Sequence, residues 1–378
     1  MHRAPRSSIL STAETVVVKV GTNVLADGSG HLDRARIQSL ADQVQRVRAA
    51  GRKVALVSSG AIGAGVGKLK LGKRPDDLPH LQACAAVGQS ALMQLYQECF
   101  TPYGVHTAQL LLTAGDFDTR ARYLNVKNTI RTLFEYECLP IINENDTVSV
   151  AEIKFGDNDH LAAMVANLLQ APLLILLTNV DGLFSADPRE DPSAHLLDTV
   201  ATIDRSVTDL AGVTKSNLGT GGMKSKLRAA RLATAAGGAV VMANGSHDGI
   251  LDQIFAGESV GTLFLPQGEA MPAWKRWLGY TARPLGMFLI DAGAKKALLE
   301  QGKSLLPVGV QSVCGEFGKG SVIAICDESG VEIGRGLSNY TAIEAAKIAG
   351  LKTEQINELL GKTPYVEMIH RDNLVVTV

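Results

Sequence analysis

Short apolar runs rich in β-branched residues alternate with longer segments of helical periodicity through the first two thirds of the chain. Such runs are VVVKV (16–20), KVALVSS (53–59) and LLILLTNV (173–180). Because they lack polar alternation, strands formed from them need cover on both faces, as in a parallel sheet flanked by helices. We therefore predict an α/β fold of three layers, with helices on both faces of a mainly parallel sheet.

The chain is long enough for two domains, and its pattern changes near residue 265. Further strands are expected over 106–112, 138–143 and 238–244, and helices over 33–50, 119–136, 158–169 and 223–236. Residues 265–286 contain three prolines, three glycines and both tryptophans, and shorter strand-like pieces follow them. We expect the α/β domain over 1–266, a linker over 267–284 and a small β-rich domain over 285–378.

Composition and charge exclude several classes of protein. Apolar residues make up 46% of the 378 residues, which is too many for a disordered chain. The 37 basic and 38 acidic residues nearly cancel, which argues against a nucleic-acid coat or a polybasic membrane binder. No apolar run approaches the roughly 20 residues of a membrane span. The five cysteines form no CxxC pair, so reduced thiols and a cytoplasmic location are expected.

Three glycine-rich segments are suited to binding anions, although the common nucleotide motifs are absent. Neither GxxxxGK[ST] nor GxGxxG is complete anywhere in the chain. The three segments are 19–23 (KVGTN), 58–65 (SSGAIGAG) and 219–226 (GTGGMKSK). Turns that lead into a helix present free N–H groups and a positive dipole end, and glycine lets a phosphate approach the backbone. Two of the three segments carry lysine, which favours a phosphate site.

A polar cluster lies between these segments. NENDT (143–147) follows an apolar strand directly, and GDND (156–159) opens a helix. Asp157 or Asn158 could simply cap that helix, but a cap needs one such residue and three stand in a row. Polar groups at the carboxyl end of a strand lie where open α/β sheets bind ligands. Carboxylates there could hold an ammonium group or support Mg²⁺, and amides could donate to a carboxylate.

These segments, in their order along the chain, closely resemble those of the glutamate 5-kinases in the amino-acid kinase family. The resemblance rests on VVVKVGTNVL, VSSGAIGAG, AAVGQS, INENDTV, EIKFGDNDHLAA, TNVDGLF and LGTGGMKSK. FLIDAGAKKALLEQGKSLLPVGV, further on, is similar to a PUA module. The resemblance implies ATP-dependent phosphorylation of the γ-carboxylate of L-glutamate, the first step of proline synthesis. It also implies feedback inhibition by proline, assembly into a homo-oligomer (dimer or tetramer), and Mg²⁺ held mainly by the ATP phosphates rather than by a protein metal site.

The resemblance also implies roles for individual residues. Lys19 and Lys226 would flank the transferred phosphoryl group, and Asp159 would orient both lysines. Glutamate would be bound by Ser59, Asp146, Asn158, Asn143 and Asp157. ATP would be bound by Lys19, Thr178, Asn179, Thr220, Gly221, Gly222, Met223, Lys224, Ser225 and Lys226.

Other interpretations remain open at this point. Lys19 could be an edge-strand lysine that guards against aggregation, and Lys224 could replace Lys226 as the working lysine. Another kinase for a small carboxylate, such as an acetylglutamate or aspartate kinase, would share the fold. The segment INEND (142–146) argues against this alternative. A nucleic-acid-binding protein is disfavoured, because residues 285–378 hold nine basic and eleven acidic side chains.

Overall fold

The computed structural model describes residues 3–27, 31–118, 120–148, 158–211, 222–267, 273–352, 355–356 and 366–377. The chain divides into two compact units. The first comprises Met1–Asp116 and Arg120–Ala270, and the second comprises Phe117–Thr119 and Met271–Val378. Among the described residues, no helix is both long and apolar enough to cross a membrane.

An eight-stranded sheet forms the centre of the first unit. Its strands are ordered β3-β4-β2-β1-β5-β7-β8-β6. All neighbouring pairs are parallel except β7 with β8. The strands are β1 (Thr15–Val20), β2 (Lys53–Ser58), β3 (Thr107–Leu112), β4 (Leu139–Glu144), β5 (Leu173–Thr178), β6 (Thr199–Val200), β7 (Ala239–Asn244) and β8 (Thr262–Phe264).

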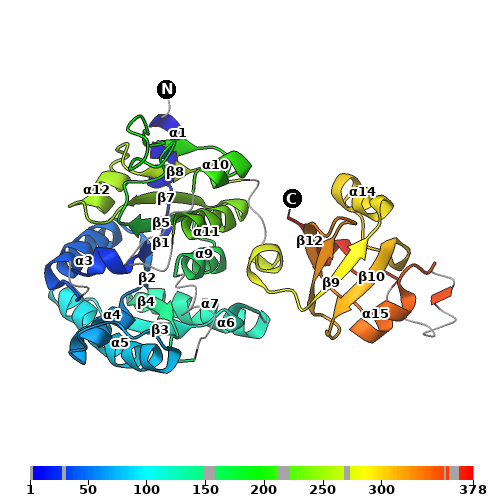
Figure 1. The fold of residues 1–378 in the computed structure, drawn as a ribbon, viewed down its shortest axis with the longest axis horizontal. Helices are drawn as coiled ribbons and strands as arrows, with labels where there is room; N and C mark the ends of the chain where they lie inside the picture. The colour runs from blue at the N-terminus through cyan, green and yellow to red at the C-terminus, as the bar shows by residue number, and fades with distance from the viewer. Residues whose placement is uncertain are drawn as a thin grey trace. The chain divides into compact units, whose positions relative to one another are not determined.

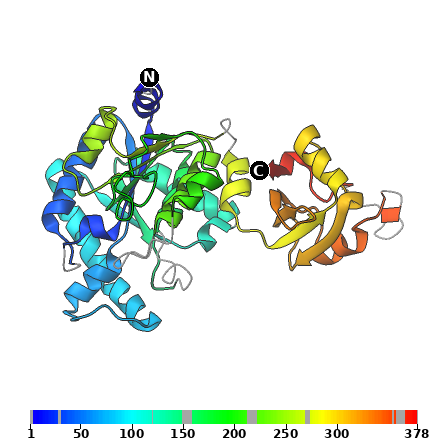
Figure 2. The same cartoon turned by 45° about the horizontal axis from the view of Figure 1, so that its top comes forward.

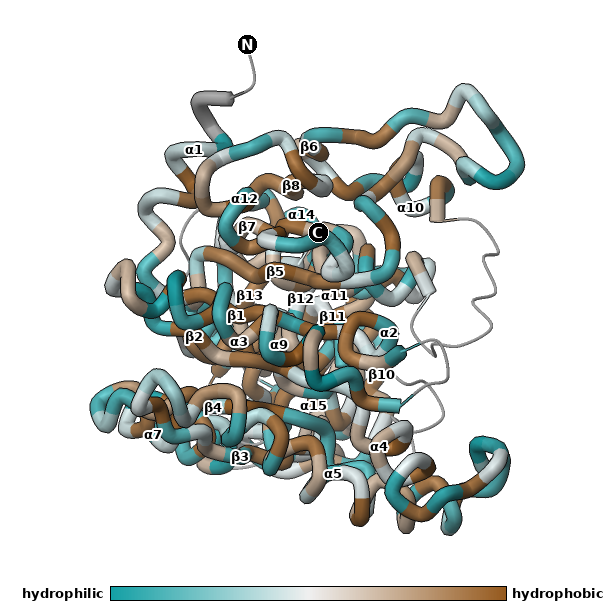
Figure 3. Tube along the Cα trace, turned by 90° about the vertical axis from the view of Figure 1, so that its left-hand side faces the viewer, coloured by the Kyte–Doolittle hydropathy of each residue, from teal (hydrophilic) through white to brown (hydrophobic). Residues whose placement is uncertain are grey.

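Helices cover both faces of this sheet, as predicted. Figure 1 shows α3 and α12 on one side of the central strands and α9 and α11 on the other. The strands are hydrophobic along their length, as the brown trace through β5, β7 and β8 in Figure 3 shows, because both of their faces are buried. The larger helices are α3 (Arg34–Ala49), α4 (Ala61–Lys68), α5 (Leu78–Phe100), α7 (Arg120–Glu135), α9 (Asn158–Leu169) and α11 (Met223–Ala235). The shorter ones are α1 (Arg3–Ser11), α2 (Thr22–Leu25), η1 (Thr101–Tyr103), α6 (Gly115–Asp118), α10 (Arg205–Asp209) and α12 (Ile250–Phe255).

The sheet register brings the predicted site segments to one edge. Val20 at the end of β1 lies opposite Ser58 of β2 and Leu177 of β5. Thr178 at the end of β5 is paired with Asn244 of β7. The segments that follow β1, β2, β4 and β5 therefore emerge at the same carboxyl edge, which is where open α/β sheets bind their ligands. Because β1 is the fourth strand of eight, Lys19 is not an edge-strand lysine, and that interpretation is wrong.

Helices α4 and α5 approach each other more closely than ordinary side chains allow. A Cβ on Gly88 would lie 1.8 Å from the carbonyl oxygen of Ala61, and a Cβ on Gly65 would lie 1.9 Å from that of Cys84. Glycine at both positions is what lets the two backbones touch. In Figure 2 the light-blue part of the chain that holds α4 and the start of α5 extends beyond the sheet.

The second unit is built on a five-stranded sheet with its own core. The strand order is β10-β9-β11-β12-β13, with β9 and β11 parallel and the other pairs antiparallel. Residues 273–281, which the sequence places in a linker, form short helical turns here. The elements are α13 (Ala273–Arg276), η2 (Trp277–Thr281), β9 (Gly286–Ile290), α14 (Ala292–Gln301), η3 (Pro307–Gly309), β10 (Val310–Gly315), β11 (Val322–Cys326), β12 (Glu332–Leu337), α15 (Ala342–Ile348), η4 (Arg371–Asn373) and β13 (Leu374–Val376).

Candidate active site

Two buried lysines share one buried carboxylate at the carboxyl edge of the sheet. The Nζ of Lys19, on β1, lies 2.5 Å from Oδ1 of Asp159. The Nζ of Lys226, in the first turn of α11, lies 3.1 Å from Oδ2 of the same side chain. Ser225 also donates its hydroxyl to Oδ2, at 3.2 Å. The carboxylate therefore fixes two ammonium groups from distant parts of the chain beside each other.

The charge balance of this triad is set by burial and by the two lysines. Burial would raise the pKa of the Asp159 carboxyl, but the nearby ammonium groups of Lys19 and Lys226 outweigh it and lower that pKa to about 2. Asp159 is therefore ionised at neutral pH. Two lysines face one carboxylate, so positive charge is in excess next to the glycine-rich turns, which suits an anionic ligand.

An amide cluster lies on the other side of the α9 start. Nδ2 of Asn158 donates to Oγ of Ser59 at 2.9 Å, to the carbonyl of Ser58 at 3.1 Å and to Oδ1 of Asn143 at 3.0 Å. These contacts join the ends of β2 and β4 to the first residue of α9. The structure thus brings together three of the residues predicted to bind glutamate.

Consecutive residues at the start of α9 connect the two groups. Asn158 belongs to the amide cluster and Asp159 to the lysine triad. Neighbouring residues of a helix point about 100° apart, so one helix end can serve two adjacent subsites. A ligand with a polar group at each end could therefore contact the amides and the lysines at once.

The helices that border these groups are preceded by glycines, which have no side chain to cap them. Gly60 precedes α4 with a φ of 105°, a left-handed conformation that favours glycine, and it provides no side-chain cap. Gly222 precedes α11, also without a side-chain cap. By contrast, Asp33 and Asp77 cap α3 and α5 with their carboxylates. Among the described residues, no side chain caps the start of α4 or of α11, so these two helix ends suit an anion.

The remaining predicted residues are distributed around this centre. Thr178 is buried at the end of β5, whereas Asn179 beside it is exposed, and their side chains lie 3.4 Å apart. Asp146 lies in the turn after β4 and is partly buried. In the first turn of α11, Lys224 is exposed and Met223 is half-buried. Three predicted residues lie outside the described residues: Asp157, Thr220 and Gly221.

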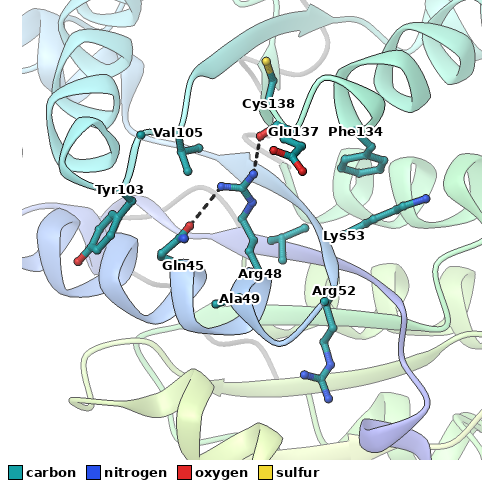
Figure 4. Close-up of a pocket in the computed structure, with 13 residues that line it drawn as sticks. Gln45, Arg48, Ala49, Arg52, Lys53, Tyr103, Val105, Phe134, Glu137 and Cys138 are labelled. Atoms are coloured by element: carbon teal, nitrogen blue, oxygen red, sulfur yellow. Dashed lines mark hydrogen bonds between the residues drawn. The ribbon is translucent and has the colours of Figure 1, made fainter.

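A cavity of about 390 Å³ lies at the opposite edge of the sheet, where β2 begins. Figure 4 shows Arg48 at its centre, with its guanidinium directed at Gln45 and at the backbone of Glu137. Arg48 thereby binds the chain just after α7, which is a structural task. None of the residues predicted to bind glutamate or ATP lines this cavity. Within the described residues, no three His, Cys, Asp or Glu side chains form a metal-binding group.

Gln89 is a further member of the amide cluster, and it is not among the residues predicted from the sequence. It lies on α5 directly after Gly88, and its Oε1 accepts a hydrogen bond from Nδ2 of Asn143 at 2.8 Å. Its side chain is buried among apolar residues of that helix. A glutamine at a core position of an otherwise apolar helical face was the signal that could have identified it.

Comparison with known proteins places the chain in a family. The amino acid kinase family matches residues 14–244 and the PUA domain matches residues 286–360. Glutamate 5-kinase of Geobacter sulfurreducens is 46% identical over 98% of this chain and 100% of its own length. Glutamate 5-kinase of Caldanaerobacter subterraneus is 46% identical over 96% of this chain and 97% of its own length. The solved carbamate kinase of Giardia lamblia is similar over 68% of this chain and 100% of its own, at 19% identity and a TM-score of 0.48.

The family matches and the level of identity agree with the geometry of the site. An α/β unit with paired buried lysines at the carboxyl edge is followed by a small β-rich unit. The chain therefore belongs to the amino acid kinase family, a family of phosphotransferases, and within it to the glutamate 5-kinases, with a C-terminal PUA domain.

Proposed function

We propose that this protein transfers the γ-phosphoryl group of ATP to the γ-carboxylate of L-glutamate, giving L-glutamyl 5-phosphate for proline synthesis. The observation that carries the proposal is the pair of buried ammonium groups held by Asp159 next to the amide cluster. The lysines suit the phosphates, and the amides suit the polar end of an amino acid. The names of the curated relatives supply the substrate.

The chemistry needs positive charge more than it needs a base. The γ-carboxylate of glutamate is already ionised at neutral pH, so no group has to deprotonate the nucleophile. Its approach to ATP is opposed by repulsion between anions, and positioning and charge neutralisation supply most of the catalysis. In the proposed mechanism Lys19 and Lys226 stabilise the oxygens of the transferred phosphoryl group. Asp159 keeps both ammonium groups in place as the charge moves.

Mg²⁺ would enter with ATP. Carboxylate and water oxygens and phosphates are its preferred ligands, and in kinases the phosphates supply many of them. The buried carboxylate of Asp159 is occupied by two lysines and a serine, so it does not provide a free ligand in this arrangement. The five cysteines are all unpaired, which supports a cytoplasmic location.

We also propose that the protein forms a homo-oligomer. Light scattering of the purified protein would test this proposal by measuring its molecular mass in solution.

A substrate panel tests the proposed activity. Purified protein with MgATP and hydroxylamine should yield a hydroxamate from L-glutamate, because hydroxylamine traps an acyl phosphate. N-acetylglutamate and aspartate test the two related activities of the same fold. Turnover of either one in preference to glutamate would reject the proposed substrate.

We further propose that proline inhibits by competing with glutamate. Proline carries the same α-carboxylate and a similar ammonium group, so the amide cluster and Asp146 could hold either molecule. Asn158→Ala should therefore weaken glutamate and proline together. Inhibition that does not change with the concentration of glutamate would argue for a separate proline site.

A further inference from the structure

The amides around Asn143 form a chain of hydrogen bonds whose direction is fixed by the backbone. The N–H of Glu144 donates to Oδ1 of Asn143 at 2.8 Å, so that atom must be the oxygen. Nδ2 of Asn143 is then the donor toward Gln89, and the Gln89 atom that accepts must be its Oε1. Likewise, Asn158 donates to the carbonyl of Ser58, which fixes its Nδ2. The side-chain amides of Asn143 and Asn158 therefore cannot be flipped without losing a hydrogen bond to the backbone.

This fixed direction leaves two buried polar atoms unused. Nε2 of Gln89 is a donor without a hydrogen-bond partner among the described residues, and the side chain is only 7% exposed. Oδ1 of Asn158 is a buried acceptor, also without a partner there. A buried polar group left unpaired costs about 1–3 kcal/mol, so an unused donor calls for an explanation.

A second buried glutamine in the same unit shows what a structural glutamine looks like. Gln43 on α3 is 4% exposed, and both ends of its amide are bonded. Its Nε2 donates to the carbonyl of Ser39 at 3.2 Å, and its Oε1 accepts from the N–H of Leu251 at 2.9 Å. The amide of Gln89 is half used by comparison, which indicates that a ligand supplies the missing acceptor.

We infer that Nε2 of Gln89 binds the α-carboxylate of the amino-acid substrate and thereby selects substrates that carry this group. The inference rests on the proposed function and extends it to a residue beyond the family-derived site. The reacting end of the substrate must lie near Lys19 on β1. Gln89 is bonded to Asn143 on β4, and β2 lies between β4 and β1. Two strand spacings amount to roughly 10 Å, which leaves room for the substrate between the two ends. Oδ1 of Asn158 is likewise an acceptor without a partner among the described residues, and the ammonium group of the substrate could donate to it.

Two substitutions separate substrate binding from simple support of Asn143. Gln89→Glu retains an oxygen that can accept from Asn143 but replaces the unused donor by a second oxygen. Gln89→Met removes both the oxygen that accepts from Asn143 and the unused donor. If Gln89 only supported Asn143, Gln89→Glu would have the KM of the wild type. If Nε2 of Gln89 binds the α-carboxylate, Gln89→Glu loses a contact with a charged group, and its KM for glutamate rises about ten- to one-hundredfold. The KM for glutamate is measured at several pH values up to 9, because burial raises the pKa of the introduced carboxyl and only its ionised form lacks a donor.

Two substrate analogues identify the group that Gln89 binds. Glutarate keeps two carboxylates and lacks the amine, and 4-aminobutyrate keeps the amine and lacks the α-carboxylate. Inhibition constants of both are measured with wild type, Gln89→Glu, Gln89→Met and the control Gln43→Met. We expect the two Gln89 variants to weaken glutarate and to leave 4-aminobutyrate and the KM for ATP within about twofold. Gln43→Met should lower the melting temperature without changing either constant.

The results distinguish this inference from the proposed function. An unchanged KM for glutamate in Gln89→Glu, or equal weakening of both analogues, would overturn the role of Gln89. Calorimetric titration of glutamate onto the same proteins gives the comparison without turnover. A wild-type enzyme that binds glutamate but makes no acyl phosphate would therefore count against the proposed reaction alone, and wild-type protein that binds no glutamate would overturn both.

Discussion

Lys226 is buried and bonded to Asp159, whereas Lys224, two residues earlier on α11, is exposed. If the Lys226 ammonium acts mainly on the transition state, Lys226→Ala should lower kcat rather than raise the KM for either substrate. The loss of one preorganised charged contact costs about 3–4 kcal/mol, or roughly 10²–10³-fold in kcat. Steady-state kinetics with the matched control Lys224→Ala, which should be mild, test this assignment. A larger effect at Lys224 would reverse it.

The lowered pKa of Asp159 predicts that the free energy of unfolding decreases at low pH. Its pKa in the folded chain is about 2, below the ordinary 3.8, so ionisation stabilises the fold above pH about 4. That contribution decreases as the pH falls from about 4 toward 2. Asp159→Asn should cost about 3–5 kcal/mol at neutral pH, because it leaves two buried lysines without their counter-charge.

Urea unfolding of wild type and Asp159→Asn at pH 7, 5 and 3 measures this difference. It should be the same at pH 7 and pH 5 and smaller at pH 3. A difference that changed between pH 7 and pH 5 would show that another group, with a higher pKa, controls the triad.

At the scale of single residues, the sequence identified candidates but not their partners. Motif order indicated Lys19, Asp159 and Lys226, yet their contacts join positions 140 and 67 residues apart, which only the sheet register brings together. Gln89 stands in AAVGQS, one of the segments that carry the family resemblance, but the resemblance assigned no role to it. Its meaning depends on the direction of the hydrogen bonds around Asn143, which sequence does not contain.

At the scale of elements, most strands and long helices could be predicted, and the exception is informative. The helix expected over 158–169 is α9 (Asn158–Leu169), and the expected strand runs correspond to β1–β5 and β7. The glycine-rich turn 58–65 is expected to lead into a helix, but the sequence assigns no bounds to α4 or α5, and α4 begins inside that turn. The sequence of α4, AIGAGVGK, contains three glycines, which disfavour an isolated helix. Packing of Gly65 and Gly88 stabilises it instead, and this is a tertiary effect that local propensity cannot show.

The close contact of α4 with α5 predicts a large effect of one added methyl group. In Gly88→Ala the new Cβ would lie 1.8 Å from the Ala61 carbonyl oxygen, so the helices must separate. Overpacking of this kind costs typically about 1–3 kcal/mol. Because Gln89 follows Gly88 and Ala61 follows the Gly60 turn, glutamate binding should weaken as well.

Gly72→Ala is the matched control, since no atom lies within 4 Å of a Cβ at that position. Thermal unfolding and the KM for glutamate of both variants test the idea. A Gly88→Ala enzyme with wild-type stability and KM would show that the two helices separate without cost to the site.

At the scale of the whole molecule, each unit has its own hydrophobic core among the described residues, which explains why the chain has two units. In the first unit a cluster packs against one face of the strands β1, β2, β5 and β7, and in the second unit a separate cluster lies on the five-stranded sheet. The change of pattern near residue 265 indicated such a division, but not where residues 273–284 belong. They fall in the second unit, where the indole N–H of Trp277 donates to the carbonyl of Phe117 at 2.8 Å.

This contact predicts that the point of truncation matters. The residues assigned to chemistry all lie at or before Lys226, so a chain that ends after Pro284 should fold and form L-glutamyl 5-phosphate with a kcat close to that of the full chain. A chain that ends after Gly268 lacks Trp277 and leaves the fully buried Phe117 without that partner. Exposure of one large side chain costs about 1.5–3 kcal/mol, so it should melt several degrees lower while remaining active. Melting curves and the hydroxamate assay on both chains test this. Equal melting temperatures would show that the contact between Trp277 and Phe117 does not stabilise the shortened chain. A folded but inactive chain ending after Pro284 would show that the PUA domain is needed for activity.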